Sequence, residues 1–150
     1  MADFDLTVGN AAAGRSAVNE GHLYKEEITF SAVDTPLAAT DRAKIFNQPA
    51  GMVLEHISAK IITPEGDAAT AEIGDGTNAD AYLDSVNLNA AAGTLIKNGG
   101  GAGAADEIGI GAISAKDGAI YLDPGAALDT CVVHFVAVFL DMRGLSTSMI

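Results

Sequence analysis

Hydrophobic residues alternate with polar ones in short runs along this chain, and turn residues separate the runs. The clearest example is residues 52–63, where Val53, Ile57, Ala59 and Ile61 share one parity. This period of two predicts a β-strand, and Pro64-Glu65-Gly66-Asp67 closes it as a turn. We expect residues 69–73 to return as its hairpin partner. The same pattern predicts further strands at residues 22–30, 43–47, 95–97, 107–113 and 119–122.

The most apolar run, residues 129–141, is apolar on both parities. One parity holds Cys131, Val133, Phe135, Ala137 and Phe139, and the other holds Val132, His134, Val136, Val138 and Leu140. Such a strand is typically central, or covered on both faces. We therefore predict that Val132, His134, Val136 and Val138 lie in the core or in a seam between subunits.

Residues 1–20 lack a long hydrophobic period, and we interpret them as a flexible N-terminal arm. Three apolar residues of the arm, Phe4, Leu6 and Val8, are spaced two residues apart. The arm could therefore pair as a strand where a neighbour offers a sheet edge. We expect it to become ordered on a partner. Residues 74–94 are rich in Asp, Asn, Gly and Ala and predict a surface excursion, with one helical turn near residues 79–83.

Seven to nine short strands with turn signals between them, and no long amphipathic helix, predict an all-β fold. An antiparallel β-sandwich, jelly-roll-like, is the architecture that fits this pattern. The length of 150 residues fits one domain, which we place at residues 21–150 behind the arm at residues 1–20.

Composition narrows the possible functions. The formal net charge is −12, with 8 Lys and Arg against 20 Asp and Glu, which argues against nucleic-acid binding because such binding depends on neutralising phosphates. No apolar run approaches the length of a membrane span, and the N-terminus carries Asp3 and Asp5 in place of a basic secretory signal. A single Cys cannot form an intramolecular disulfide.

Candidate chemistry is sparse. The acidic residues around the excursion suggest a calcium site of non-EF type, although an EF-hand starting at Asp75 fails because its ligand positions would hold Ala79 and Val86. That acidic group is Asp67, Glu72, Asp75, Asp80 and Asp84, and a solvated acidic loop is the simpler interpretation.

Other catalytic and metal motifs are missing from the sequence. Cys131 and His134 are three apart and would point to opposite faces of a strand, so they cannot share a metal ion. His134 is instead expected to be a hydrogen-bonded core or interface histidine. Neither a nucleophile elbow nor a phosphate-binding loop is found. We predict no cofactor, no metal and no catalytic activity.

One segment carries a resemblance to a known class of proteins. Residues 61–66, Ile-Ile-Thr-Pro-Glu-Gly, and residues 71–89, which begin Ala-Glu-Ile-Gly-Asp-Gly-Thr, resemble small structural proteins of tailed bacteriophages. The resemblance is clearest over residues 52–95. It implies a β-sandwich virion component on the capsid surface, of the head decoration or cement type, with the major capsid protein as partner.

The sequence leaves several functions open. Under the decoration hypothesis, Phe4, Leu6 and Val8 contact the capsid, and the chain forms a homo-oligomer, with a trimer favoured over a dimer. A tail, baseplate or fibre component of the same particle fits the sequence equally well. A jelly-roll module that binds carbohydrate is a third hypothesis, weakened because Trp, a common platform for sugars, is absent.

Overall fold

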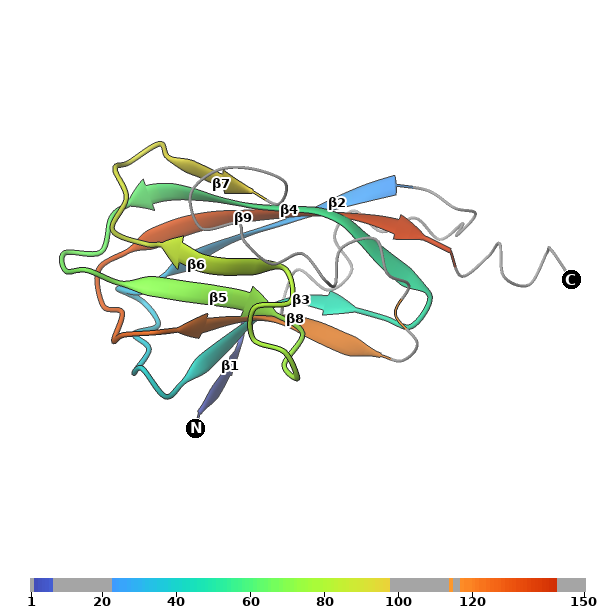
Figure 1. The fold of residues 1–150 in the computed structure, drawn as a ribbon, viewed down its shortest axis with the longest axis horizontal. Helices are drawn as coiled ribbons and strands as arrows, with labels where there is room; N and C mark the ends of the chain where they lie inside the picture. Colours follow the sequence, from blue (N-terminus) through green and yellow to red (C-terminus); the bar gives the residue numbers. More distant parts are fainter. Residues whose placement is uncertain (1, 7–22, 98–113, 115–116, 143–150) are drawn as a thin grey trace, which may run out of the picture.

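The computed structural model describes residues 2–6, 23–97, 114 and 117–142. Two β-sheets pack face to face as a sandwich, and the described residues contain no helix (Figure 1). None of these residues belongs to a helix long and apolar enough to span a membrane. The predicted all-β sandwich is therefore confirmed.

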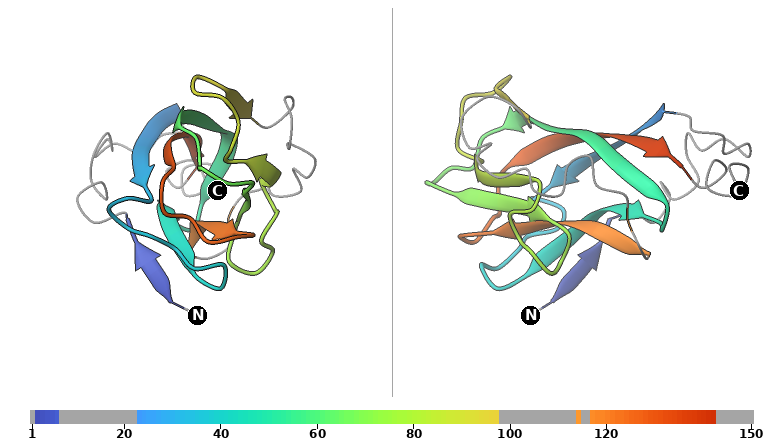
Figure 2. Two further views of the ribbon diagram at one scale, coloured as in Figure 1. Left: turned by 90° about the vertical axis from the view of Figure 1, so that its left-hand side faces the viewer. Right: turned by 45° about the vertical axis from the view of Figure 1, so that its right-hand side comes forward.

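Sheet A has five strands in the order β1-β3-β8-β5-β6, and sheet B has four in the order β2-β9-β4-β7 (Figure 2). Their bounds are β1 Asp3–Asp5, β2 Leu23–Ser31, β3 Arg42–Gln48, β4 Met52–Thr63, β5 Thr70–Gly74, β6 Leu83–Asn87, β7 Leu95–Lys97, β8 Gly118–Pro124 and β9 Val132–Asp141. Neighbouring strands are antiparallel in every described pair except β1 and β3, which run parallel.

The core lies between the sheets and follows the alternation expected of strands. In β9 the buried apolar residues are Val133, Phe135, Ala137 and Phe139, while the residues between them face outward and are half-buried. Phe139 stacks on Tyr24 and meets Phe46 of the opposite sheet edge-on, at ring-centroid distances of 5.6 and 6.5 Å. The contact between Phe139 and Phe46 joins the two sheets, while that between Phe139 and Tyr24 lies within sheet B.

Strand β9 occupies the centre of sheet B, as its two apolar faces predicted. It pairs along its whole length with both β2 and β4. Its outward residues therefore lie in the middle of the outer face of sheet B, and the prediction of a core location for Val132, His134, Val136 and Val138 is wrong. The other parity fills the core, and the alternative role of these four residues in a subunit seam stays a prediction.

The predicted hairpin between residues 52–63 and 69–73 does not form. Strand β4 already has β9 on one side and β7 on the other, so the turn after β4 carries the chain to the opposite sheet. There, β5 pairs with β6 and β8.

The predicted excursion at residues 74–94 contains a strand, β6, whose Leu83 and Val86 are buried. No helical turn forms at residues 79–83; turn and bend residues lead directly into β6. The chain folds back so tightly that a Cβ on Gly74 would lie 2.0 Å from the carbonyl oxygen of Asn78, which makes glycine necessary there. The predicted strand at residues 107–113 lies outside the described residues.

Candidate functional site

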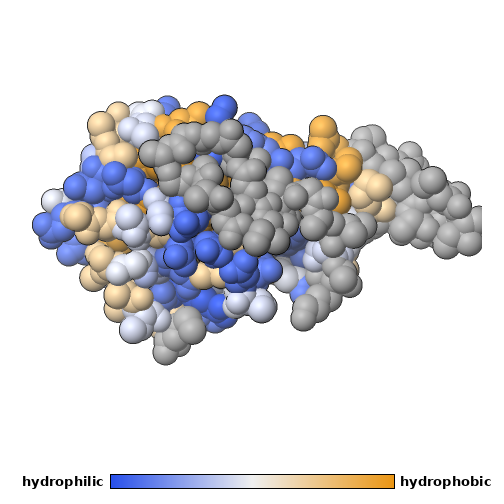
Figure 3. Space-filling model, in the orientation of Figure 1, coloured by the Kyte–Doolittle hydropathy of each residue, from blue (hydrophilic) through white to orange (hydrophobic). Residues whose placement is uncertain are grey.

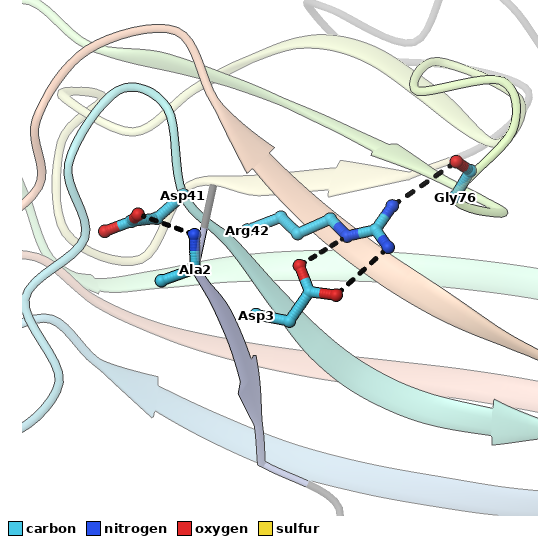
Figure 4. A network of polar contacts seen from close by, with 5 residues as sticks. All are labelled: Ala2, Asp3, Asp41, Arg42 and Gly76. Atoms are coloured by element: carbon cyan, nitrogen blue, oxygen red, sulfur yellow. Dashed lines mark hydrogen bonds and ion pairs between the residues drawn. The ribbon is translucent and has the colours of Figure 1, made fainter.

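Strand β1 is held on the edge of sheet A by ion pairs between residues of opposite charge. Asp3 accepts hydrogen bonds from Arg42 Nε and Nη2 at 2.8 and 3.1 Å, which makes a bidentate ion pair (Figure 4). Two residues further, Lys44 Nζ lies 3.0 Å from Asp5 Oδ2. Since the register pairs Asp3 with Arg42 and Asp5 with Lys44, each acid faces a base across the strands. We call these four residues the β1 latch.

Further contacts extend the β1 latch on both sides. The backbone N–H of Ala2 donates to Asp41 Oδ1 at 3.2 Å (Figure 4). The other oxygen of Asp41 accepts the N–H of Ala38 at 2.9 Å. On the far side, Arg42 Nη1 donates to the carbonyl oxygen of Gly76 at 3.3 Å. One arginine therefore connects β1 to the loop between β5 and β6.

Arg42 is the centre of this network. Its guanidinium lies 4.0 Å from the centroid of the Tyr121 ring, a cation–π contact. The hydrogen bond from Arg42 holds the pKa of Asp3 below its usual value, and the same bond raises the pKa of Arg42. Both groups therefore stay charged over the ordinary pH range.

An open depression of about 450 Å³ lies beside the β1 latch. Its lining combines cations, acids and one aromatic ring: Arg42, Lys44, Asp75, Thr77, Asp117 and Tyr121. The bases at its edge already bind Asp3 and Asp5. The depression thus has polar walls and holds no arrangement of nucleophile and base among the described residues.

The structure places two of the three predicted arm residues on the protein's own body. Phe4 and Leu6 are partly buried and pack against the core, and Leu6 N–H donates to the carbonyl oxygen of Lys44 at 2.9 Å. The arm therefore does pair as a strand, with β3 of the same chain as the neighbour. Val8 lies outside the described residues, and contact of these residues with a capsid stays a prediction.

The second candidate surface is the outer face of sheet B. Val132, His134, Val136 and Val138 form its central row, and exposed Leu23 and Leu95 lie on the flanking strands. Figure 3 shows hydrophobic residues among hydrophilic ones along the upper edge of the molecule, the side of sheet B in Figure 1. The row is flanked on both sides by polar and charged residues, among them Lys25, Glu27 and Lys60, so this face combines an apolar centre with a polar surround.

His134 takes part in hydrogen bonds on this face. Its Nδ1 lies 2.9 Å from Thr29 Oγ1, and its Nε2 lies 3.4 Å from Glu27 Oε1. The pKa of Glu27 is lowered, mainly by the hydrogen bond with His134 and next by the hydrogen bond with Lys25. The prediction of a hydrogen-bonded histidine is confirmed, although it lies on the outer face and not in the core.

The acidic loop gives no metal site within the described part of the chain. Asp75 uses Oδ1 to accept the N–H groups of Thr77 and Asn78 at 2.8 and 2.7 Å, which closes a local turn. No three acidic, His or Cys side chains among the described residues converge on a common point. The calcium hypothesis therefore finds no support from these residues.

Sequence reasoning missed a buried acidic contact. Glu65, assigned only to a turn, is 4% exposed, and its carboxylate accepts the backbone N–H groups of Asp129, Thr130 and Cys131 at 3.3, 3.2 and 3.0 Å. Burial acts to raise the pKa of Glu65, but these three bonds outweigh it and hold the pKa below its usual value.

Cys131 is a buried thiol beside Glu65. Burial and the nearby carboxylate raise the pKa of Cys131 to about 12, so the thiol is protonated and unreactive at neutral pH. It lies on the core side of sheet B while His134 lies on the outer side, so the two residues cannot bind one metal, as predicted.

Comparison with known proteins adds the fold relationship. No protein-family model matches the sequence, and no curated protein matches it significantly. A chain from the capsid of Ralstonia phage GP4 superposes with a TM-score of 0.67 at 10% identity, covering 93% of this chain and 98% of that one. The chain shares its fold with components of phage capsids.

Two further capsid structures support this relationship. A chain of the cyanophage Pam1 capsid asymmetric unit has a TM-score of 0.56 at 15% identity, covering 87% of this chain and 91% of that one. A chain from the acid-stable capsid of Helicobacter pylori bacteriophage KHP30 has a TM-score of 0.56 at 9% identity, covering 81% of this chain and 89% of that one. At these identities the likeness concerns the fold.

Proposed function

We propose that this protein is a structural component of a phage capsid, and specifically a decoration or cement protein on the outer surface of the head. The fold likeness carries the proposal, since it covers nearly all of this chain and of the chain from the GP4 capsid. The resemblance of residues 52–95 to small virion proteins points the same way, from the sequence.

The physical properties of the surface suit this role. A stabilising protein needs a rigid body and extended contact surfaces, and avidity over many copies makes weak individual contacts sufficient. The sandwich supplies the body, and two surfaces are available on it: the outer face of sheet B, with its central row of valines, and the edge with the β1 latch. The net charge of −12 disfavours contact with the packaged genome, which fits an outer position.

The partners in this proposal are the major capsid protein and further copies of this chain. The row from Val132 to Val138 on the outer face of sheet B serves as the seam of a homo-oligomer, with a trimer favoured. The proposed role is structural and requires no catalysis.

The test compares phage shells that lack this protein with shells to which purified protein is added. We expect the protein to co-sediment with shells at a fixed copy number and to raise the temperature at which they open. Cryo-microscopy of the same particles then gives its position. Particles that carry the protein only in the tail, or shells that neither bind it nor gain stability, would refute the decoration role.

A further inference from the structure

Strand β1 is a small, separable part of sheet A. It has three residues, lies at the edge of the sheet and, among the residues that the structure describes, pairs with Arg42–Lys44 of β3 alone. Its backbone bonds include those from Arg42 N–H to the carbonyl oxygen of Ala2 at 3.0 Å and from Leu6 N–H to Lys44 at 2.9 Å. Two ion pairs, the ladder with β3 and the packing of Phe4 hold β1 in place, and the loss of β1 leaves the other eight described strands paired.

The β3 edge recognises a defined pattern. The β1 latch requires an acid at the positions opposite Arg42 and Lys44, and Phe4 between them packs toward the core. The edge thus selects a parallel segment of the form acid, apolar, acid. Addition of such a segment to a sheet edge is a general mode of peptide recognition.

Every copy of this chain carries both halves of the contact. A second copy offers an identical Asp-Phe-Asp segment, and the contacts are the same whether the segment comes from its own chain or from a neighbour. Exchange of an identical element is therefore a low-cost route to an oligomer. The choice between the two arrangements depends on the effective concentration of the neighbouring segment, which is high when copies are held side by side.

The chain is long enough for such an exchange. Residues 7–22 separate the described end of this segment from β2. A stretch of that length can span at most about 55 Å, which exceeds the diameter of roughly 40 Å expected for a domain of this size. The segment can thus reach the β3 edge of an adjacent copy.

We propose that, in the assembled protein, the β3 edge of each copy binds the Asp3–Asp5 strand of a neighbouring copy, so that the β1 latch joins subunits. This inference rests on the proposed assembly of copies but not on binding to a shell. It gives the oligomer a second contact in addition to the outer face of sheet B, with partner specificity set by charge.

The test uses the wild-type protein and a zero-length cross-linker. Equal amounts of unlabelled and ¹⁵N-labelled protein are unfolded in urea, mixed and refolded together at high concentration without shells, so that partners are drawn from both pools. A carbodiimide then joins carboxylates to amines in contact. Asp5 and Lys44 are suited to this reaction because their side chains are 3.0 Å apart. After tryptic digestion, mass spectrometry measures, for each cross-linked pair, whether the peptide with Asp5 and the peptide with Lys44 carry the same nitrogen isotope.

Exchange predicts that about half of these cross-linked pairs combine a light peptide with a heavy one, since partners are drawn at random from the mixture. Pairs with a single isotope only would overturn the proposal. The Lys44→Arg variant is the control, because it keeps the positive charge and removes the reactive amine, so this cross-link must disappear. Binding to shells is measured separately, so that failure of exchange and failure of the decoration role give different results.

Discussion

Replacement of Glu65 by Ala should destabilise the fold strongly, although this residue lies in a turn. The change leaves three backbone N–H groups, those of residues 129–131, without their acceptor. The donor of Cys131 is fully buried, whereas Asp129 and Thr130 are exposed enough for water to replace part of the loss. At about 1–3 kcal/mol for each buried donor left unsatisfied, we expect a loss of about 2–4 kcal/mol.

Thermal unfolding followed by circular dichroism measures this loss. For a chain of this size, a loss of that order corresponds to a fall in Tm of roughly 5–15 °C. Asp67→Ala is the matched control, because Asp67 belongs to the same turn and is exposed. A fall no larger for Glu65→Ala than for Asp67→Ala would refute the assignment of Glu65 as the acceptor that fixes the start of β9.

The pH dependence provides a second check on the same residue. The folded-state pKa of Glu65 lies below the ordinary value of 4.5, so its ionised form favours the folded state. Its contribution is complete above the unfolded pKa and is lost as the pH falls through the folded pKa. The stability difference between wild type and Glu65→Gln should therefore be constant near neutral pH and shrink below about pH 4.5. A difference that widens in acid contradicts the sign of this shift.

Three further results are expected. Gly76→Ala should lower stability by about 1–2 kcal/mol in urea unfolding, because the glycine has φ +86° and a Cβ would lie 2.8 Å from Tyr121 Cε2; an unchanged midpoint would contradict this. Val136→Asp, on the outer face of sheet B, should reduce the mass seen by light scattering while the circular dichroism spectrum stays unchanged, and an unaltered oligomer would exclude this residue from the seam. Cys131 should resist iodoacetamide at pH 8 until the protein is unfolded, since it is buried with a pKa of about 12; rapid labelling of the folded protein would show that the site is open.

Strand positions could be predicted from sequence because alternation is a local signal. Residues 52–63 and 95–97 coincide with β4 and β7, and the apolar run at residues 129–141 contains β9. Alternation failed where the backbone is irregular. A bulge between Leu54 and His56 shifts the register, so Leu54 joins Ile57 in the core cluster, whereas Val53, although buried, lies outside that cluster.

Strand pairing and the candidate surfaces could not be predicted in the same way, because they depend on contacts distant in sequence. Nothing local to Glu65 indicates that its carboxylate meets residues 129–131. The complementary charges of Asp-Phe-Asp and Arg-Ala-Lys are visible in the sequence, but 39 positions separate Asp3 from Arg42, and only the fold shows that they pair. A search for alternating charges of opposite sign on candidate edge strands could have found the β1 latch.

The central position of β9 has a consequence for synthesis of the protein. Strands β2 and β4 leave the ribosome early, yet each needs β9, and the register joins Leu23 to Leu140. Sheet B therefore cannot close until nearly all of the described chain has been translated, and pairing over such separations is intrinsically slow. Until then, the nascent chain exposes the unpaired backbone edges and the apolar core residues of β2 and β4 to other chains. A high rate of translation should therefore favour inclusion bodies, and slower expression should increase the soluble yield.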